Sequence, residues 1–263
     1  MKKYEKILFS YKMVFIILSF LSIYGYWIWR LIDKADLNNK YHGSIELLTI
    51  EHFTTFTLLS NVFCQVWFII AAIQYKREGL TKATSYTTAS TLLTCITVTM
   101  LVYNAVLIPI SGFPTGVIPQ LSNIYNHVFM PIGFIVYVLF LMPRKKEVEL
   151  NQFFLKKFYI QFLIIFIYCI FALIRGELRY QSENNGIYKY YEMVNGELKE
   201  KNFFYPYFFL NVHDKKGVGG IPGIAIFFMT FVGILGLMIG LSYLYNFSSN
   251  LIIQKNYYKN LNR

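Results

Sequence analysis

The 263-residue sequence is poor in charged residues and in cysteine. Asp, Glu, Lys and Arg together make up 15% of the chain, whereas a soluble domain of this length normally carries about 25%. The three cysteines lie inside apolar segments and form no CxxC pair, so neither a disulfide framework nor a zinc ribbon is expected. The shortage of charge excludes an ordinary soluble domain and indicates a membrane protein.

Apolar residues dominate the rest of the composition. Hydrophobic residues make up 56% of the chain, and the mean hydropathy is +0.43. Helices of about 20 apolar residues can span a bilayer, and six such segments lie near 8–32, 53–75, 86–108, 124–142, 154–175 and 222–246. The sequence therefore predicts an all-α integral membrane protein, with residues 1–263 forming a single membrane domain.

The basic residues predict the orientation of these segments. Fifteen Lys and Arg residues lie within 1–12, 76–82, 144–157 and 255–263, against eight within 34–40 and 179–216. The positive-inside rule then places both termini in the cytoplasm. The clusters flank apolar segments, so the net charge of +11 does not indicate a nucleic-acid partner. The abundance of Lys, Asn, Ile, Tyr and Phe is typical of an AT-rich bacterial genome, and we expect a bacterial plasma membrane.

Two connections on the predicted outer side are unusual. The 109–123 connection contains PISGFPTGVIPQ, with three prolines, two glycines and no charge. It either dips into the membrane interface, packed against protein or a cavity, or forms a stiff surface loop. The 176–221 connection is longer, polar and rich in tyrosine, and we expect it to be a loop.

Ionisable groups are scarce inside the apolar segments. Lys12 and Arg175 lie near segment ends, from which their long side chains can reach the interface. The sequence shows no intramembrane charge pair and no broken helices in matching halves, two features that favour transport. His127 is different, because it lies inside the fourth segment, four residues before Pro131. A titratable group at this depth is either a structural histidine bonded to a carbonyl or a functional group.

The second segment carries a polar face. Thr57, Ser60, Asn61 and Cys64 are spaced i, i+3, i+4 and i+7, which places them on one side of a helix. The third segment has a similar face, for which we expect hydroxyls to bond the carbonyl four residues back; its members are Thr87, Ser90, Thr91, Thr94 and Thr97. An amide cannot be satisfied in this local way, so Asn61 should face protein, water or substrate.

Topology brings Thr57 and His127 to one layer. Both segments run from outside to inside, and each residue is expected about one turn, roughly 5–6 Å, below the start of its helix. A threonine hydroxyl becomes a nucleophile when a base takes its proton, and histidine is the usual base. With Asn61 as a candidate oxyanion donor, this set would suit acyl transfer.

Three motifs carry a resemblance to a known family. FTLLSN (56–61), NHVFMP (126–131), and FYPYFFLN followed by GVGG (204–220) together resemble the bacterial branch of the androgen-induced and androgen-dependent integral-membrane threonine hydrolases. The order and spacing of the motifs and the six spans match over nearly the whole chain. Where the branch often has YPYPFLD, this sequence has Phe208 and Asn211 in place of the second proline and the aspartate.

The resemblance implies a hydrolase of fatty-acyl esters that needs no cofactor or metal. Its nucleophile would be Thr57 and its partner His127, acting near the outer leaflet on a lipid substrate supplied by the bilayer. We expect further residues to bind substrate or the oxyanion; these are Ser60, Asn61, Tyr205, Tyr207 and Asn211.

Two alternatives compete with this hypothesis. A zinc-dependent lipid hydrolase or amidase could use histidines on the predicted outer side with nearby acids, although no HxxxH or HExxH motif is present; the residues are His42, His52, His127, His213, Glu51 and Asp214. A non-enzymatic polytopic protein, such as a transporter or a lipid-binding component, could use the same Thr, Ser and Asn faces to line a solute path.

Overall fold

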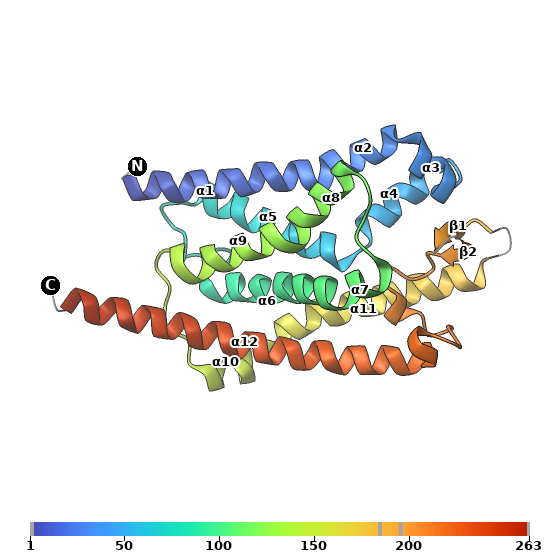
Figure 1. Cartoon of the computed structure of the whole chain (residues 1–263). Helices are drawn as coiled ribbons and strands as arrows, with labels where there is room; N and C mark the ends of the chain where they lie inside the picture. Colours follow the sequence, from blue (N-terminus) through green and yellow to red (C-terminus); the bar gives the residue numbers. More distant parts are fainter. Residues whose placement is uncertain (1–2, 184–185, 195–196, 262–263) are drawn as a thin grey trace. The chain divides into compact units, whose positions relative to one another are not determined.

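The computed structural model describes residues 3–183, 186–194 and 197–261, and it is built from helices (Figure 1). Six helices are long and apolar enough to cross a membrane: Lys3–Ile32, Phe56–Ile73, Tyr86–Ser111, Val117–Leu141, Phe158–Gln181 and Gly223–Lys255. The predicted six-span, all-α architecture is thereby confirmed. Lys2 and Arg263, two of the basic residues on which the orientation prediction depends, lie outside the described residues.

Contacts divide the chain into two compact units. Unit 1 comprises Met1–Ile23, Thr57–Leu163 and Gly236–Arg263, and unit 2 comprises Tyr24–Phe56 and Ile164–Leu235. The boundaries fall inside four of the long helical segments, so each unit contains several parts of the chain that are distant in sequence.

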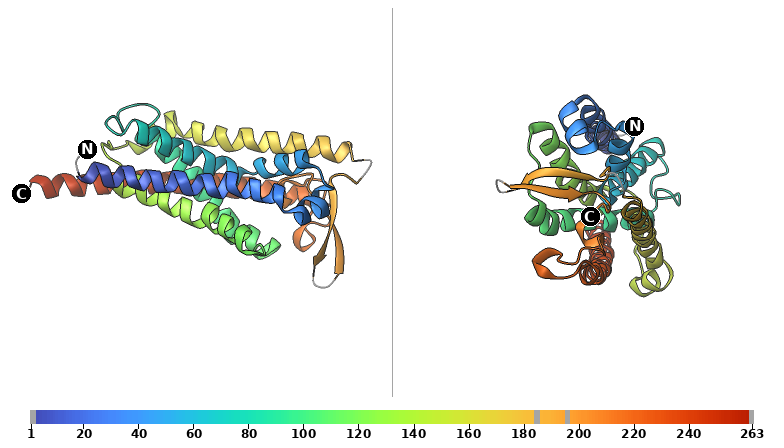
Figure 2. Two further views of the ribbon diagram at one scale, coloured as in Figure 1. Left: turned by 90° about the horizontal axis from the view of Figure 1, so that it is seen from above. Right: turned by 90° about the vertical axis from the view of Figure 1, so that its right-hand side faces the viewer.

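Unit 1 is a helical bundle whose long helices run side by side (Figures 1 and 2). Its main helices are α1 (Lys3–Phe20), α5 (Phe56–Ile73), α6 (Tyr86–Val102), α8 (Val117–Ile124), α9 (Met130–Val136) and α10 (Leu150–Lys156). Three π-helical segments interrupt or extend them, at Tyr103–Leu107, Tyr125–Phe129 and Tyr137–Leu141. The unit also contains α7 (Ile108–Ser111), the start of α11 (Phe158–Gln181) and the later part of α12 (Gly223–Leu261).

An aromatic cluster forms the centre of unit 1. The Phe68 and Phe134 side chains are fully buried, with ring centroids 5.2 Å apart, and Trp67 and Tyr137 pack around them. Gly133 allows α9 to approach α1, because a Cβ there would lie 2.0 Å from Phe15 Cζ. This packing fixes α1, α5 and α9 against one another.

Lys12 does not reach the interface as predicted, because it is buried in unit 1. Its Nζ lies 2.5 Å from Glu78 Oε2, and both side chains are only 1% exposed. Tyr137 donates a hydrogen bond to the other carboxylate oxygen of Glu78 at 2.6 Å, and Lys12 also donates to the Ala71 carbonyl. A buried charge pair, which the sequence did not reveal, therefore joins α1 to the connection after α5.

Lys145, beyond the fourth span, gives unit 1 a pH-dependent stability. Burial lowers the pKa of Lys145 to about 8, against about 10.4 when exposed. Between these values the unfolded chain binds more protons, so the free energy of unfolding should rise with pH from about 8 to 10.4. We expect Lys145→Met to remove this rise, measured by thermal unfolding of wild type and variant in detergent across that range. Stability that changes with pH in the same way in wild type and in Lys145→Met would contradict the prediction.

The 109–123 connection, for which the sequence left open a dip into the membrane interface or a stiff surface loop, is mostly helical. α7 and α8 leave only residues 112–116 between them, with positive φ at Gly112 and Gly116. Pro109 and Pro119 lie in the first turns of their helices, where proline is tolerated because the N–H has no intrahelical partner. The fourth span thus begins seven residues earlier than predicted.

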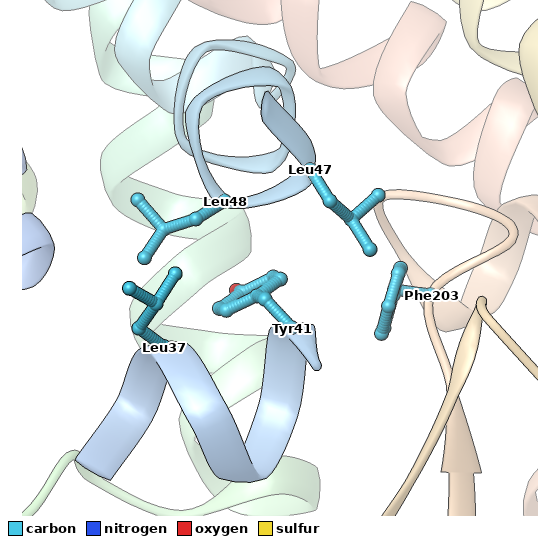
Figure 3. Packing of buried hydrophobic residues seen from close by; sticks show 5 residues of the cluster. All are labelled: Leu37, Tyr41, Leu47, Leu48 and Phe203. Carbon is cyan, nitrogen blue, oxygen red and sulfur yellow. The ribbon is translucent and has the colours of Figure 1, made fainter. Parts of the chain in front are cut away.

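Unit 2 combines short helices with a hairpin. Its elements include α2 (Tyr26–Ile32), α3 (Lys34–Tyr41), α4 (Ile45–Phe53), most of α11, and the antiparallel strands β1 (Lys189–Val194) and β2 (Glu197–Asn202). Buried apolar side chains from α3, α4 and the segment after β2 pack together (Figure 3); these are Leu37, Tyr41, Leu47, Leu48 and Phe203. The hairpin was not predicted, since residues 176–221 read as a polar loop.

Candidate active site

Thr57 and His127 are in contact in unit 1. The Thr57 Oγ1 atom lies 3.3 Å from His127 Nε2, although seventy positions separate the two residues. The prediction that they share one layer is therefore correct. The predicted depth of His127 is wrong, because it follows the start of α8 by ten residues, or roughly 15 Å, rather than by one turn.

The hydrogen bonds of His127 define its tautomer. His127 Nδ1 lies 3.0 Å from the carbonyl oxygen of Asn123, and a carbonyl can only accept, so Nδ1 carries the proton. In the neutral ring, Nε2 then offers a lone pair to the Thr57 hydroxyl. A nucleophile bonded to a base, with the base oriented by a third group, is the general arrangement of hydroxyl nucleophiles.

A π-helical segment presents His127. Residues Tyr125–Phe129 form one π-helical turn, and such turns occur frequently at functional sites. The His127 ring stacks on Tyr103, which begins the neighbouring π-helical segment, with centroids 3.4 Å apart and planes at 15°. The Asn123 side chain donates to the Tyr103 hydroxyl. Together with the Asn123 carbonyl, these contacts hold the imidazole in one orientation.

Ser60 and Asn61 bind the backbone of Thr57. The Ser60 hydroxyl and the Asn61 amide lie 2.9 and 2.8 Å from the Thr57 carbonyl oxygen, and the second Asn61 N–H donates to the Asn126 carbonyl at 3.1 Å. Both N–H groups of Asn61 are thus engaged, which leaves none for an oxyanion, in contrast to the predicted role. One N–H bonds a carbonyl of its own helix, while the other reaches Asn126, so the expectation that Asn61 faces protein is correct.

Asn61 connects the nucleophile to the base through the main chain. Its side chain is fully buried and joins the carbonyl of Thr57 in α5 to that of Asn126, the residue before His127. Ser60 adds a second link, since its hydroxyl lies 2.8 Å from Thr99 Oγ1 in α6. The polar face therefore positions Thr57 relative to His127.

The hydroxyls of the third span differ from Thr57 in their partners. Four of them bond carbonyls of their own helix, as predicted; these are Ser90, Thr91, Thr94 and Thr97. Thr54 likewise donates to the Ile50 carbonyl. The Thr57 hydroxyl instead lies beside a histidine ring, that of His127. Its side chain is half-buried, while His127 is 7% exposed.

The predicted loop residues Tyr205, Tyr207 and Asn211 belong to unit 2. The Tyr205 hydroxyl lies 3.3 Å from Glu177 Oε2, which also lies 2.6 Å from His213 Nε2. Burial raises the pKa of Tyr205 to about 12, so its hydroxyl stays protonated at neutral pH and can donate. Tyr207 stacks on Phe209, and Asn211 Oδ1 accepts from the His213 N–H. Within unit 2 these contacts order the loop.

The histidines of the zinc alternative have separate partners. His42 Nε2 bonds the Lys189 carbonyl, His213 pairs with Glu177, and the His52 ring packs edge-on against Phe53. Among residues 3–183, 186–194 and 197–261, no three His, Cys, Asp or Glu side chains are grouped so that they could hold a metal ion. The structure thus gives the zinc alternative no support in that part of the chain.

The fold and the site define a multi-pass membrane protein with a Thr–His pair in which the histidine is buried and oriented. In comparisons with protein-family models, curated proteins and solved structures, nothing matches the chain. Function is therefore inferred from the chemistry of the site.

Proposed function

We propose that this chain is an intramembrane hydrolase of fatty-acyl esters, with Thr57 as the nucleophile and His127 as the general base. One observation carries the proposal: Nε2 of a histidine with a protonated Nδ1 lies 3.3 Å from the Thr57 hydroxyl oxygen. The resemblance of FTLLSN, NHVFMP and FYPYFFLN to threonine hydrolases supports the same chemistry.

The reaction would proceed in two steps. In the first, Thr57 Oγ1 attacks the ester carbonyl while His127 Nε2 accepts the hydroxyl proton, and the tetrahedral intermediate expels the alcohol, which takes that proton from His127. In the second, His127 deprotonates a water that attacks the acyl-threonine. The fatty acid then leaves, and the proton held by His127 returns to Thr57 Oγ1.

The membrane would supply the substrate. Six helices apolar enough to span a membrane support a route by which a fatty-acyl chain would reach the Thr–His pair by diffusion in the lipid. With both termini in the cytoplasm, as the basic residues favour, Thr57 at the start of α5 lies toward the outer leaflet. We infer a bacterial plasma membrane, which the abundance of Lys, Asn, Ile, Tyr and Phe supports.

Hydrolysis of a long-chain fatty-acyl ester by purified protein in detergent tests the proposal. We expect Thr57→Ala to lower kcat by about 10³-fold or more, because it removes the nucleophile. Thr94→Ala is the matched control, since Thr94 is a buried threonine whose hydroxyl donates to the Ser90 carbonyl of its own helix; it should keep activity within about threefold of wild type. Full activity in Thr57→Ala would refute the mechanism.

A further inference from the structure

A second candidate site lies in unit 1, formed by residues outside the Thr–His pair. A cavity of about 420 Å³ opens between the start of α6 and the segment that leads from the fourth span into α11. Its charged lining residues are four basic and two acidic: Arg144, Lys146, Lys156, Lys157, Glu147 and Glu149. This volume lies within the range of about 300–1,000 Å³ that is usual for small-molecule sites.

The cavity lies at the ends of the membrane spans. Its lining residues come from 79–87 and 144–157, which flank or form the connection between the second and third spans and that between the fourth and fifth. The third and fourth spans lie between these two connections. Because two crossings return the chain to the same side, both connections are on the same side of a membrane. A cavity at this level faces the lipid head groups.

The lining suits a phosphate group attached to an apolar molecule. The four basic side chains outnumber the two acidic ones, which leaves a net positive charge on the lining. Lys157 reaches Thr87 Oγ1, at the first turn of α6, at 3.4 Å. Val148 and Phe153 supply an apolar part of the wall. The basic side chains would neutralise phosphate while the apolar part contacts the glycerol and the start of the acyl chains.

We propose that this cavity binds the phosphate-bearing head group of a membrane lipid. Basic pockets at the ends of membrane helices are suited to such head groups. A soluble phosphate would meet the same charges but would gain nothing from the apolar wall or from the position of the cavity at the head-group layer. The site is independent of the proposed hydrolase activity.

Titration of phosphatidylglycerol into the purified full chain, followed by native mass spectrometry, tests the proposal. In the variant Lys146→Gln/Lys156→Gln/Lys157→Gln, we expect about 100-fold weaker binding, since each basic residue contributes about fivefold. The matched control is Lys76→Gln/Arg77→Gln/Lys82→Gln, which removes the same charge from the same side of the spans at positions that do not line the cavity. It should bind within about threefold of wild type. Equal losses in both variants would overturn the proposal.

Single substitutions at Gln152 provide a second test. Gln152 lines the cavity and is exposed, so neither a glutamate nor a lysine there should affect folding. Gln152→Glu is expected to weaken phosphatidylglycerol binding by about fivefold and Gln152→Lys to strengthen it by a similar factor. No change in either variant would contradict the site. Inorganic phosphate that binds as tightly as phosphatidylglycerol would overturn the lipid assignment.

Discussion

Replacing His127 with glutamine is expected to abolish ester hydrolysis, with kcat lowered by about 10³-fold or more. Glutamine is polar and of similar size, but its amide cannot accept the proton of the Thr57 hydroxyl as His127 Nε2 does at 3.3 Å. Binding of the apolar substrate does not require that proton transfer, so KM should change by less than about threefold. The measurement is steady-state kinetics on a fatty-acyl ester in detergent.

Tyr103→Phe serves as the control for His127→Gln. Phenylalanine keeps the ring that stacks on His127 and removes only the hydroxyl that accepts from Asn123. We expect its kcat to stay within about tenfold of wild type, because one neutral hydrogen bond contributes about 1 kcal/mol. A His127→Gln enzyme as active as Tyr103→Phe would remove His127 from the reaction.

Replacing Lys12 alone with methionine is expected to lower the free energy of unfolding by about 3–5 kcal/mol. The change leaves the Glu78 carboxylate, which is 1% exposed, without its cation in a poorly solvated interior. The measurement is unfolding in detergent, by heat and by denaturant, with circular dichroism at a fixed pH. Retention of helix content in the folded baseline shows that the variant forms the same structure.

Two further variants separate charge pairing from simple loss of packing. In the double variant Lys12→Met/Glu78→Gln no unpaired charge remains, so most of the lost stability should return. Lys189→Met breaks the exposed pair with Glu200, whose side chains are 37% and 49% exposed, and should cost less than about 1 kcal/mol. If Lys12→Met costs no more than Lys189→Met, the buried pair does not stabilise unit 1 as described.

The spans could be predicted because a long apolar segment is a local property of the sequence. Their ends could not, since Pro109 and Pro119 indicate breaks but lie in the first turns of helices, where proline is allowed. The partner of Lys12 could not be predicted from the sequence either. Glu78 is 66 positions away and lies outside the apolar segments, so only the packing of α1 against the connection after α5 reveals the pair.

The placement of Thr57 and His127 in one layer could be predicted, because alternating crossings place both residues toward the same side. Only some of the groups that orient the Thr57–His127 pair could be identified from the sequence. Asn123 precedes His127 by one helical turn, so its carbonyl was a detectable candidate, but Tyr103 reads as one aromatic residue among many in an apolar segment. The role of Asn61 was misjudged because its amide reaches the Thr57 carbonyl one turn earlier and the Asn126 carbonyl as well.

The central claim is that Thr57 is an activated nucleophile, and the most direct measurement is the site of covalent labelling by a long-chain fluorophosphonate. Attack by Thr57 Oγ1 on phosphorus would expel fluoride and leave a phosphonyl-threonine, located by mass spectrometry of peptides. We expect one adduct, on the peptide that contains Thr57, in wild type and in Thr94→Ala, and none in Thr57→Ala or His127→Gln. An adduct on another residue, or undiminished labelling of Thr57→Ala, would contradict it.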